Sequence, residues 1–326
     1  MKRIATILSL AGLLVLPLAA TAQKASKKDN AKRAYKEWKL VWADEFNGNE
    51  LDTDSWERCP RNTADWGRHM SNLDSLVKVE DGVLKLYGIN RPEGVEDNVP
   101  FLTGGVQSRH RRSMKMGRFD VRARFDCGQG FWPAIWLMPD IRVPWPTGGE
   151  IDIMEHLNSE DIAYQTVHSQ HSVKKYDPYI LNGGSGPIDR DKFNVYSVEI
   201  EEDIIKFFIN GKPTFTYKKV PELESQFPYA SHPFYVILSA QLGGSWVGKV
   251  KPEDLPVRMD IDYVRFYQPK KQPTHETYFY NRDSTHYATR QPGRYCPNDT
   301  AHQRQHKSRI GQRSPQSSQG LEAGVG

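Results

Sequence analysis

The chain has 326 residues, 38% of them hydrophobic, and a formal net charge of +4. This length allows a sizeable core in one large β domain or in two small domains. The basic excess comes from the ends of the chain, from Lys2 and Arg3 and from the arginine-rich segment after Thr274, so the charge gives no reason to expect nucleic-acid binding.

The first 22 residues have the pattern of a secretory signal peptide. Two basic residues precede an apolar run over 7–18, and the small residues at 20–22 form a cleavage site before Gln23. The apolar run is too short for a membrane span. We therefore expect an exported protein, periplasmic or extracellular, in which 23–37 is a mobile lead-in.

Residues 38–270 contain many short β-strand patterns separated by turn residues. Asp81-Gly82 separates two such runs, and Asn210-Gly211 follows the run Ile204–Ile209. Both dipeptides favour tight hairpins. Long helical periodicity and alternation of strands with helices are absent from the pattern. The sequence therefore predicts an all-β domain, a sandwich of two antiparallel sheets.

Three acidic residues lie within six positions of one strand-like segment: Glu150, Asp152 and Glu155. Alternate side chains of a strand share a face, so Glu150 and Asp152 point to one side and Glu155 points to the other. A β-bulge at Ile153-Met154 would bring Glu155 back beside the other two acids. Like charges this close indicate chemistry; the alternative is an exposed strand that carries solvated acids.

The spacing favours two carboxyl groups that act together. With the bulge, Glu150 and Glu155 lie about four strand steps apart, or roughly 13 Å between Cα atoms. Side chains that lean toward each other would bring the carboxyl groups to about 5–6 Å, a separation typical of a retaining glycosidase. Asp152 would hydrogen-bond a neighbour and help to separate the two pKa values. Tryptophans at 132–136 and Trp145 add aromatic planes of the kind that hold sugar rings.

The stretch from Phe131 to His168 resembles glycoside hydrolase family 16, in the subgroup with a bulged Glu-x-Asp-x-x-Glu motif. The resemblance covers roughly residues 38–268. The further segments that carry it, in family order, are Trp42–Gly48 with Leu51-Asp52, Gly117–Arg124, and Asp262–Tyr267.

The resemblance implies a concanavalin A-like β-jelly roll whose concave face forms an open substrate cleft, and therefore endo-acting cleavage of a polysaccharide. By position in the family motif, Glu150 is the nucleophile, Asp152 its supporting carboxylate and Glu155 the general acid/base. No cofactor is required for this chemistry, and we expect a monomer. A sugar-binding, lectin-like sandwich and a transglycosylase have the same architecture and stay open as alternatives.

The resemblance also implies a set of side chains that bind sugar. Two would be platforms near the cleaved bond and three would border the cleft; simple packing roles are the alternative. These candidates are Trp136 and Trp145, then Trp132, His168 and Trp246.

Two further groups of residues follow from the same resemblance. Arg109, in the basic run 109–112, could meet an anionic sugar or lie in a solvated loop. Family members often hold a structural calcium away from the chemistry, and Glu45, the Gly82 carbonyl and Asp262 match its ligand positions. The alternative for the acids is an ordinary surface role.

The substrate is the least determined property. The tryptophan-rich segments resemble laminarinases, which cut β-1,3-glucan or mixed β-1,3/1,4-glucan. One residue departs from that pattern: laminarinases usually carry an arginine twelve residues before Gly117, and this chain has Gly105 there. A glycine at this position is similar to the family's red-algal galactan enzymes, the agarases and porphyranases.

Residues 271–326 have few aliphatic side chains and do not resemble the family, so we expect a disordered or aberrant tail. The three cysteines, Cys59, Cys127 and Cys296, lack metal-ligand spacing and indicate neither a zinc site nor a disulfide framework. A single Cys59–Cys127 bridge stays open.

Overall fold

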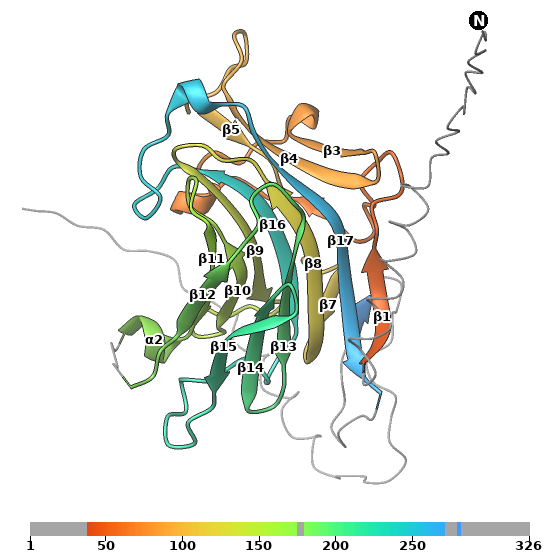
Figure 1. Ribbon diagram of the computed structural model, residues 1–326, viewed down its shortest axis with the longest axis vertical. Helices are drawn as coiled ribbons and strands as arrows, with labels where there is room; N and C mark the ends of the chain where they lie inside the picture. The colour runs from red at the N-terminus through yellow and green to blue at the C-terminus, as the bar shows by residue number, and fades with distance from the viewer. Residues whose placement is uncertain (1–37, 175–178, 271–278, 282–326) are drawn as a thin grey trace, which may run out of the picture. The chain divides into compact units, whose positions relative to one another are not determined.

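The computed structural model describes residues 38–174 and 179–270, together with the backbone of 279–281. All of them belong to the first of two compact units, Met1–Ser284; the second unit, Thr285–Gly326, lies outside the described residues. The predicted signal peptide and lead-in, 1–37, and most of the predicted tail also lie outside them. The described residues form two antiparallel sheets (Figure 1), as predicted.

The first sheet has nine strands within the described part of the chain. In hydrogen-bonding order, seven of them are β15 (Lys212–Lys218), β14 (Ile204–Ile209), β13 (Asn194–Ile200), β8 (Gly117–Phe125), β17 (Val257–Pro269), β4 (Val83–Asn90) and β3 (Val77–Glu80), with β1 (Trp38–Asp44) beside β17 and β5 (Phe101–Thr103) beside β4.

The second sheet also has nine described strands, and it carries the acidic segment in its middle. The order is β12 (Gly183–Pro187), β11 (Ile162–His168), β10 (Glu150–Glu155), β9 (Phe131–Pro139), β16 (Phe234–Leu242), β6 (Gly105–Gln107) and β2 (Glu57–Arg58), with β7 (Arg112–Met114) beside β16 and β18 (Phe279–Asn281) beside β7.

Helical structure in the described residues is short. It consists of η1 (Asp65–Gly67), η2 (Asp74–Leu76), η3 (Pro252–Asp254) and α2 (Gln170–Lys174). None of these helices has the length and apolar character needed to span a membrane.

The hydrophobic core lies between the two sheets. Ile151, Ile153 and Met154 of β10 are fully buried and belong to one cluster with residues of the first sheet such as Val121 and Val198. Burial of each large aliphatic side chain stabilises the fold by roughly 1.5–3 kcal/mol. Because the core occupies one face of the second sheet, alternate side chains lie on its opposite face, which we call the outer face of the second sheet.

Both predicted hairpin turns are confirmed. Asp81 and Gly82 connect β3 to β4 with φ angles of 56° and 72°, and Asn210 and Gly211 connect β14 to β15 with 52° and 76°. Two successive residues with positive φ make the type of turn whose twist matches that of the strands, and asparagine, aspartate and glycine tolerate it best.

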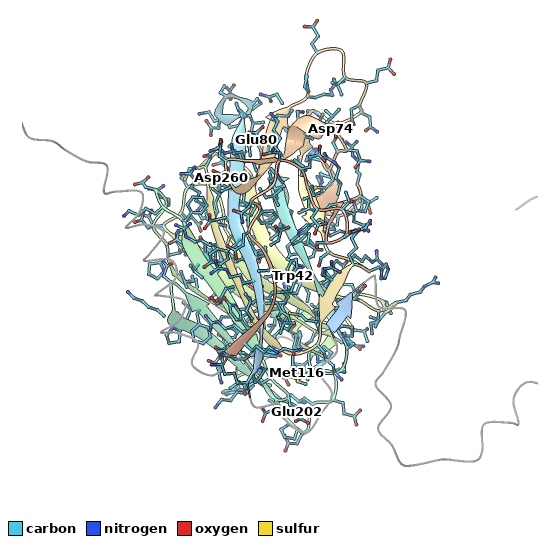
Figure 2. The ribbon with its side chains drawn as sticks, turned by 90° about the vertical axis from the view of Figure 1, so that its right-hand side faces the viewer. Trp42, Asp74, Glu80, Met116, Glu202 and Asp260 are labelled. Atoms are coloured by element: carbon cyan, nitrogen blue, oxygen red, sulfur yellow. The ribbon has the colours of Figure 1, made fainter. Side chains whose placement is uncertain are left out.

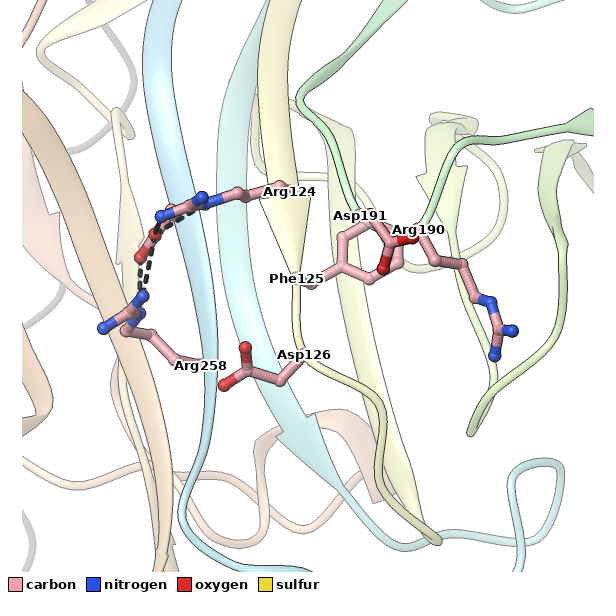
Figure 3. A pocket seen from close by; sticks show the side chains of 7 residues that line it. Arg124, Phe125, Asp126, Arg190, Asp191 and Arg258 are labelled. Atoms are coloured by element: carbon pink, nitrogen blue, oxygen red, sulfur yellow. Dashed lines mark hydrogen bonds and ion pairs between the residues drawn. The ribbon is translucent and has the colours of Figure 1, made fainter.

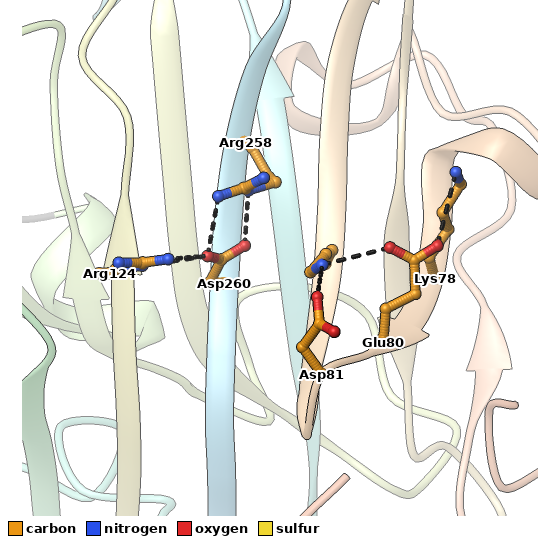
Figure 4. A network of polar contacts seen from close by, with 7 residues as sticks. Lys78, Glu80, Asp81, Arg124, Arg258 and Asp260 are labelled. Atoms are coloured by element: carbon orange, nitrogen blue, oxygen red, sulfur yellow. Dashed lines mark hydrogen bonds and ion pairs between the residues drawn. The ribbon is translucent and has the colours of Figure 1, made fainter. Parts of the chain in front are cut away.

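Charged side chains form ion pairs on the first sheet (Figure 4). Asp260 of β17, labelled in Figure 2, lies 2.9 Å from Arg124 of β8 and 2.7 Å from Arg258. Lys85 of β4 lies 2.8 Å from Asp81. An exposed pair contributes about 0.2–1 kcal/mol. Breaking a pair of Asp260, which is buried, costs more because an uncompensated charge would stay inside the protein. These ion pairs lie away from β10 and therefore belong to the scaffold.

One strand lies inside the predicted tail. The backbone of Phe279–Asn281 pairs antiparallel with β7, with Phe279 opposite Met114. These three residues are the part of the predicted tail that the structure describes, so the expectation for the remainder of 271–326 stays a prediction. An edge of β7 that is not covered by β16 is available for such pairing.

Candidate active site

A β-bulge in β10 brings the three acids to one face of the second sheet. Asp152 lies opposite Trp136 of β9, whereas Glu155 lies opposite Ala134, and the register shifts between them. The same shift occurs against β11. Three residues of β10 therefore span two residues of each neighbour, which restores the parity of Glu155. The predicted bulge is confirmed, and the acids share the outer face of the second sheet.

The acids are held by aromatic and imidazole groups. Nε1 of Trp145 donates to Oε2 of Glu150 at 2.5 Å, and Nε1 of Trp132 donates to Oε1 of Glu155 at 3.0 Å. Nε2 of His168 lies 3.3 Å from Oδ2 of Asp152. His168 stands opposite Glu150 in the ladder between β10 and β11. Each acid thus has its own neighbour, and the neighbours come from β9, β11 and the loop before β10.

Burial shifts the proton affinity of all three carboxyl groups upward. It raises the pKa of Glu150 to about 8, helped by the nearby charge of Asp152, while His168 and the Trp145 hydrogen bond oppose the rise. Burial raises the pKa of Asp152 to about 7. The pKa of Glu155 is raised well above its ordinary value, first by burial and then by the charge of Asp152. The site therefore retains protons near neutral pH, as a general acid requires.

Exposed tryptophans flank the acids on two sides. Trp145, beside Glu150, is 54% exposed, and Trp246 is 47% exposed. Trp246 lies edge-on to Trp132, with ring centroids 5.7 Å apart, and its centroid is 5.2 Å from that of Tyr164. Partly exposed aromatic faces next to carboxylates suit the apolar faces of a sugar. The structure thus brings Trp145, Trp132, Trp246 and His168 to the acids.

Trp136 has a different environment. It lies on the same face, opposite Asp152, but it is only 5% exposed and its Nε1 donates to Oγ of Ser239 at 3.1 Å. Trp66 of η1 packs edge-on against it, with centroids 4.8 Å apart. Trp136 therefore supports Trp66, and little of its ring is open to a sugar; its role as a sugar platform stays a prediction. No local pattern singles out Trp66, because its place over β9 depends on how the segment 59–76 folds.

Comparison with known proteins gives the family. Residues 69–265 match the family model of glycosyl hydrolases family 16. The chain belongs to this family. The predicted family and class, a glycoside hydrolase, are therefore confirmed.

Relatives of this family 16 chain act on different polysaccharides. A keratan-sulfate endo-1,4-β-galactosidase from Sphingobacterium multivorum is 33% identical over 78% of this chain and 61% of its own length. A β-glucanase from Rhodothermus marinus is 32% identical over 71% of this chain and 85% of its own length. The X-ray structure of the laminarinase from Rhodothermus marinus has a TM-score of 0.65 at 30% identity, covering 72% of this chain and 98% of that one.

The space beside Gly105 is filled in this family 16 domain. Gly105 lies on β6, opposite Ser239 of β16. A Cβ at this position would lie 3.0 Å from Sδ of Met70 and 3.2 Å from Sγ of Cys59. The side chains of the segment 59–76 thus occupy the volume that a larger residue at 105 would need.

Arg109 lies in the loop between β6 and β7, exposed to solvent. Its guanidinium carbon is 5.9 Å from the ring centroid of Tyr235, a residue of β16. The other basic residues of the run have acidic or backbone neighbours: His110 with Asp140 at 2.8 Å and Arg111 with Glu57 at 3.1 Å. The Arg109 guanidinium thus lies near an aromatic ring of the second sheet.

The expected calcium ligands do not fit a calcium site. Both carboxylate oxygens of Glu45 accept hydrogen bonds from Arg265, at 2.6 and 2.9 Å, and Oδ2 of Asp262 accepts one from Arg122 at 2.5 Å. A cation would have to displace an arginine from each acid. These two carboxylates are ion-pair partners of arginines on β17 and β8.

The two described cysteines are both free, Cys59 buried and Cys127 exposed. They do not form the disulfide bridge that the sequence left open. Cys59 packs into the small cluster under Trp136, whereas Cys127 follows β8 at the surface. Cys296 lies outside the described residues.

A separate cavity of about 260 Å³ lies at the ends of β8 and β17 (Figure 3). Its charges are balanced within the protein, because Arg124 and Arg258 bind Asp260 and Arg190 binds Asp161 at 2.6 Å. None of the residues that line this cavity belongs to β10, which carries the three acids. The candidate active site is therefore the group of three acids on the outer face of the second sheet.

Proposed function

We propose that this chain is an endo-acting, retaining glycoside hydrolase of a β-linked polysaccharide. The observation that carries the proposal is the bulge of β10, which sets Glu150, Asp152 and Glu155 on one face. Tryptophan N–H groups hold the first and the last of these acids. Two carboxylic acids on one face, beside exposed aromatic rings, are the groups that glycoside cleavage requires.

In the first step, a carboxylate oxygen of Glu150 attacks the anomeric carbon while Glu155 gives its proton to the leaving oxygen, and the glycosidic bond breaks. In the second step, Glu155 takes a proton from water, the water oxygen attacks the anomeric carbon, and the bond to Glu150 breaks. Two inversions at one carbon retain its configuration. His168 favours the ionised form of Glu150 before the first step and after the second, when this carboxylate is not bonded to the sugar.

The raised pKa of Glu155 supports its role as the acid, because burial favours the protonated form of this carboxyl group. Glu150 must be ionised to attack. The Trp145 hydrogen bond and His168 both lower its pKa and therefore favour the ionised form against burial. The groups that react in both steps are these two carboxyl groups, water and the sugar.

Our first candidate substrate is β-1,3-glucan or mixed-linkage β-1,3/1,4-glucan. The β-glucanase and laminarinase relatives support it through their coverage of the whole domain. We further propose export to the periplasm or the exterior, where such polymers are met, from the signal-peptide pattern of residues 1–22. A monomer that binds one polysaccharide chain is sufficient for this activity.

A β-galactoside polymer is the second candidate, and a specific observation favours it. This chain has Gly105 where laminarinases usually place an arginine, and side-chain atoms of Met70 and Cys59 lie 3.0 and 3.2 Å from where a Cβ would stand. The relative from Sphingobacterium multivorum is named for a β-galactosidic bond. Glucose and galactose differ in the orientation of one hydroxyl group, and a missed hydrogen bond to it costs about 1–3 kcal/mol.

The test is incubation of the full chain with laminarin, barley β-glucan, lichenan, keratan sulfate, agarose and porphyran. Early release of oligosaccharides of intermediate size from one polymer supports endo-acting hydrolysis and names the substrate. Proton NMR of the first products should show retained anomeric configuration. An inverted first product would overturn the retaining mechanism, and transfer of the glycosyl unit to added sugar in place of water would assign a transglycosylase.

A further inference from the structure

Two surface segments that are far apart in the sequence are tied together beside Glu155. The first is 59–76, which contains η1, and the second is 243–248, which follows β16. Oδ2 of Asp65 accepts the backbone N–H of Ser245 at 2.6 Å, across 180 positions of the chain. The other oxygen of the same carboxylate pairs with Arg68.

The packing around this hydrogen bond is close. Gly244 has φ of +147°, and a Cβ there would lie 3.1 Å from Oδ2 of Asp65. Glycine therefore permits both the backbone conformation and the approach of the carboxylate. Gly244 and Gly248 exchange backbone hydrogen bonds of 3.3 and 3.0 Å, which close the turn that presents Trp246. We call residues 244–248 the Trp246 turn.

The Trp246 turn leads to the proposed acid/base. Trp246 packs against Trp132, and Trp132 donates a 3.0 Å hydrogen bond to Glu155. Tyr164, on the other neighbour of β10, supports Trp246 from the second side. A continuous set of contacts therefore runs from Asp65 through Ser245, Trp246 and Trp132 to Glu155. The core cluster between the sheets contains none of these five residues.

We propose that Asp65 is a positioning residue, which holds the Trp246 turn against Trp132 and so keeps Glu155 oriented for proton transfer. The inference rests on the proposed function, in which Glu155 is the acid/base. Asp65 belongs to the segment 59–76, so the proposal gives this segment a role in the reaction. The same segment carries Trp66, which packs against Trp136 on the outer face of the second sheet.

The experiment compares Asp65→Ala and Asp65→Asn with a matched control, Asp74→Ala. Asp74 is an exposed acid of the same segment, and it pairs with Arg58 at 3.0 Å without touching the Trp246 turn. On the polymer that the wild-type chain cleaves, Asp65→Ala should lower kcat about tenfold. Asp65→Asn should retain at least a third of kcat, since its amide oxygen still accepts the Ser245 N–H, and the control should match wild type.

A double-mutant cycle separates positioning from general loss of structure. If Asp65 acts through Trp246, then Asp65→Ala should cost nothing further in a Trp246→Ala background. Additive losses would overturn the proposal. So would an Asp65→Ala variant that keeps more than half of the wild-type kcat, or an Asp65→Asn variant as slow as Asp65→Ala.

A second readout uses the dinitrophenyl glycoside of the oligosaccharide that the wild type releases. Dinitrophenolate leaves without protonation, so formation of the glycosyl-enzyme needs no acid, whereas its hydrolysis still needs the base. Asp65→Ala should therefore show a normal burst and a slow steady state. A burst slowed as much as the steady state would overturn the proposal. A wild-type chain that cleaves no polymer would reject the function and the inference together; an active wild type with an additive cycle rejects the inference alone.

Discussion

The indole N–H of Trp145 donates a 2.5 Å hydrogen bond to Oε2 of Glu150, and the same tryptophan is 54% exposed. Trp145 can therefore contact both the proposed nucleophile, Glu150, and the sugar. Its N–H stabilises the ionised form of Glu150, while its open ring face suits a sugar. Replacing the ring or the donor separately distinguishes these two effects.

Trp145→Phe should keep an aromatic face and remove the hydrogen bond to Glu150. The bond lowers the pKa of Glu150, so its loss should raise that pKa and move the acidic limb of kcat/KM to higher pH. The loss should be about tenfold at pH 6 and smaller at pH 8. The pH profile of Trp246→Phe, which has no bond to Glu150, is the control. If the acidic limb of kcat/KM lay at the same pH in Trp145→Phe as in wild type, the hydrogen bond from Trp145 would not control the ionisation of Glu150.

Glu150→Gln should abolish turnover and leave sugar binding nearly intact. The amide has almost the same shape as the carboxylate but cannot attack the anomeric carbon. We expect a loss of several powers of ten in kcat, with Kd for a product oligosaccharide within a fewfold of wild type. Steady-state kinetics and calorimetric titration give the two numbers. A variant that retains a tenth of the wild-type rate would show that another residue is the nucleophile.

The same substitution should change how stability depends on pH. Burial raises the pKa of Glu150 from 4.5 to about 8. Between these values the unfolded chain releases a proton that the folded chain keeps, so the stabilising contribution, complete below pH 4.5, is lost as pH rises through 8. Glu150→Gln removes this dependence. The melting temperature of Glu150→Gln should therefore rise relative to that of wild type between pH 4.5 and 8.5, by the equivalent of about 4 kcal/mol.

The control for this measurement is Glu222→Gln, which changes an exposed glutamate in the loop after β15. It should follow the wild-type melting temperature at every pH. A difference between Glu150→Gln and wild type that stays constant with pH would show that the carboxyl group of Glu150 titrates alike in the folded and unfolded chain.

Glu155→Ala should be partly rescued by azide. Azide attacks the glycosyl-enzyme without help from a base, so it replaces the second role of Glu155. The expected product is a glycosyl azide of retained configuration, identified by NMR. Azide rescue of Glu150→Ala should instead give the inverted glycosyl azide. If the two variants gave products of the same configuration, the roles of the two acids would need to be reassigned.

Gly105→Arg should destabilise the domain, because Met70 and Cys59 occupy the space for a side chain. Overpacking of this kind costs about 1–3 kcal/mol, which corresponds to a fall in melting temperature of about 2–10 °C for a domain of this size. Met70→Ala in the same chain should restore part of the loss by making room. An unchanged melting temperature for Gly105→Arg alone would show that the segment 59–76 moves freely.

Local sequence determined the features that depend on neighbouring residues. The acids at 150, 152 and 155 can share a face of a strand only through a bulge, so their spacing predicts one, and β10 has it. The hairpins at Asp81-Gly82 and Asn210-Gly211 follow in the same way from φ preferences. The family, and with it the fold, follows from the order of such segments along the chain.

Tertiary structure alone decided which distant residues meet. Trp136 and Trp145 are similar in sequence context, yet Trp66 covers the first and leaves the second open. Glu45 meets an arginine 220 positions away, and Asp65 meets the backbone of Ser245 across 180 positions. Such partners depend on strand order and loop paths. A side chain's local pattern fixes the face on which it lies, but the opposing segment fixes whether it is buried, paired or free to bind.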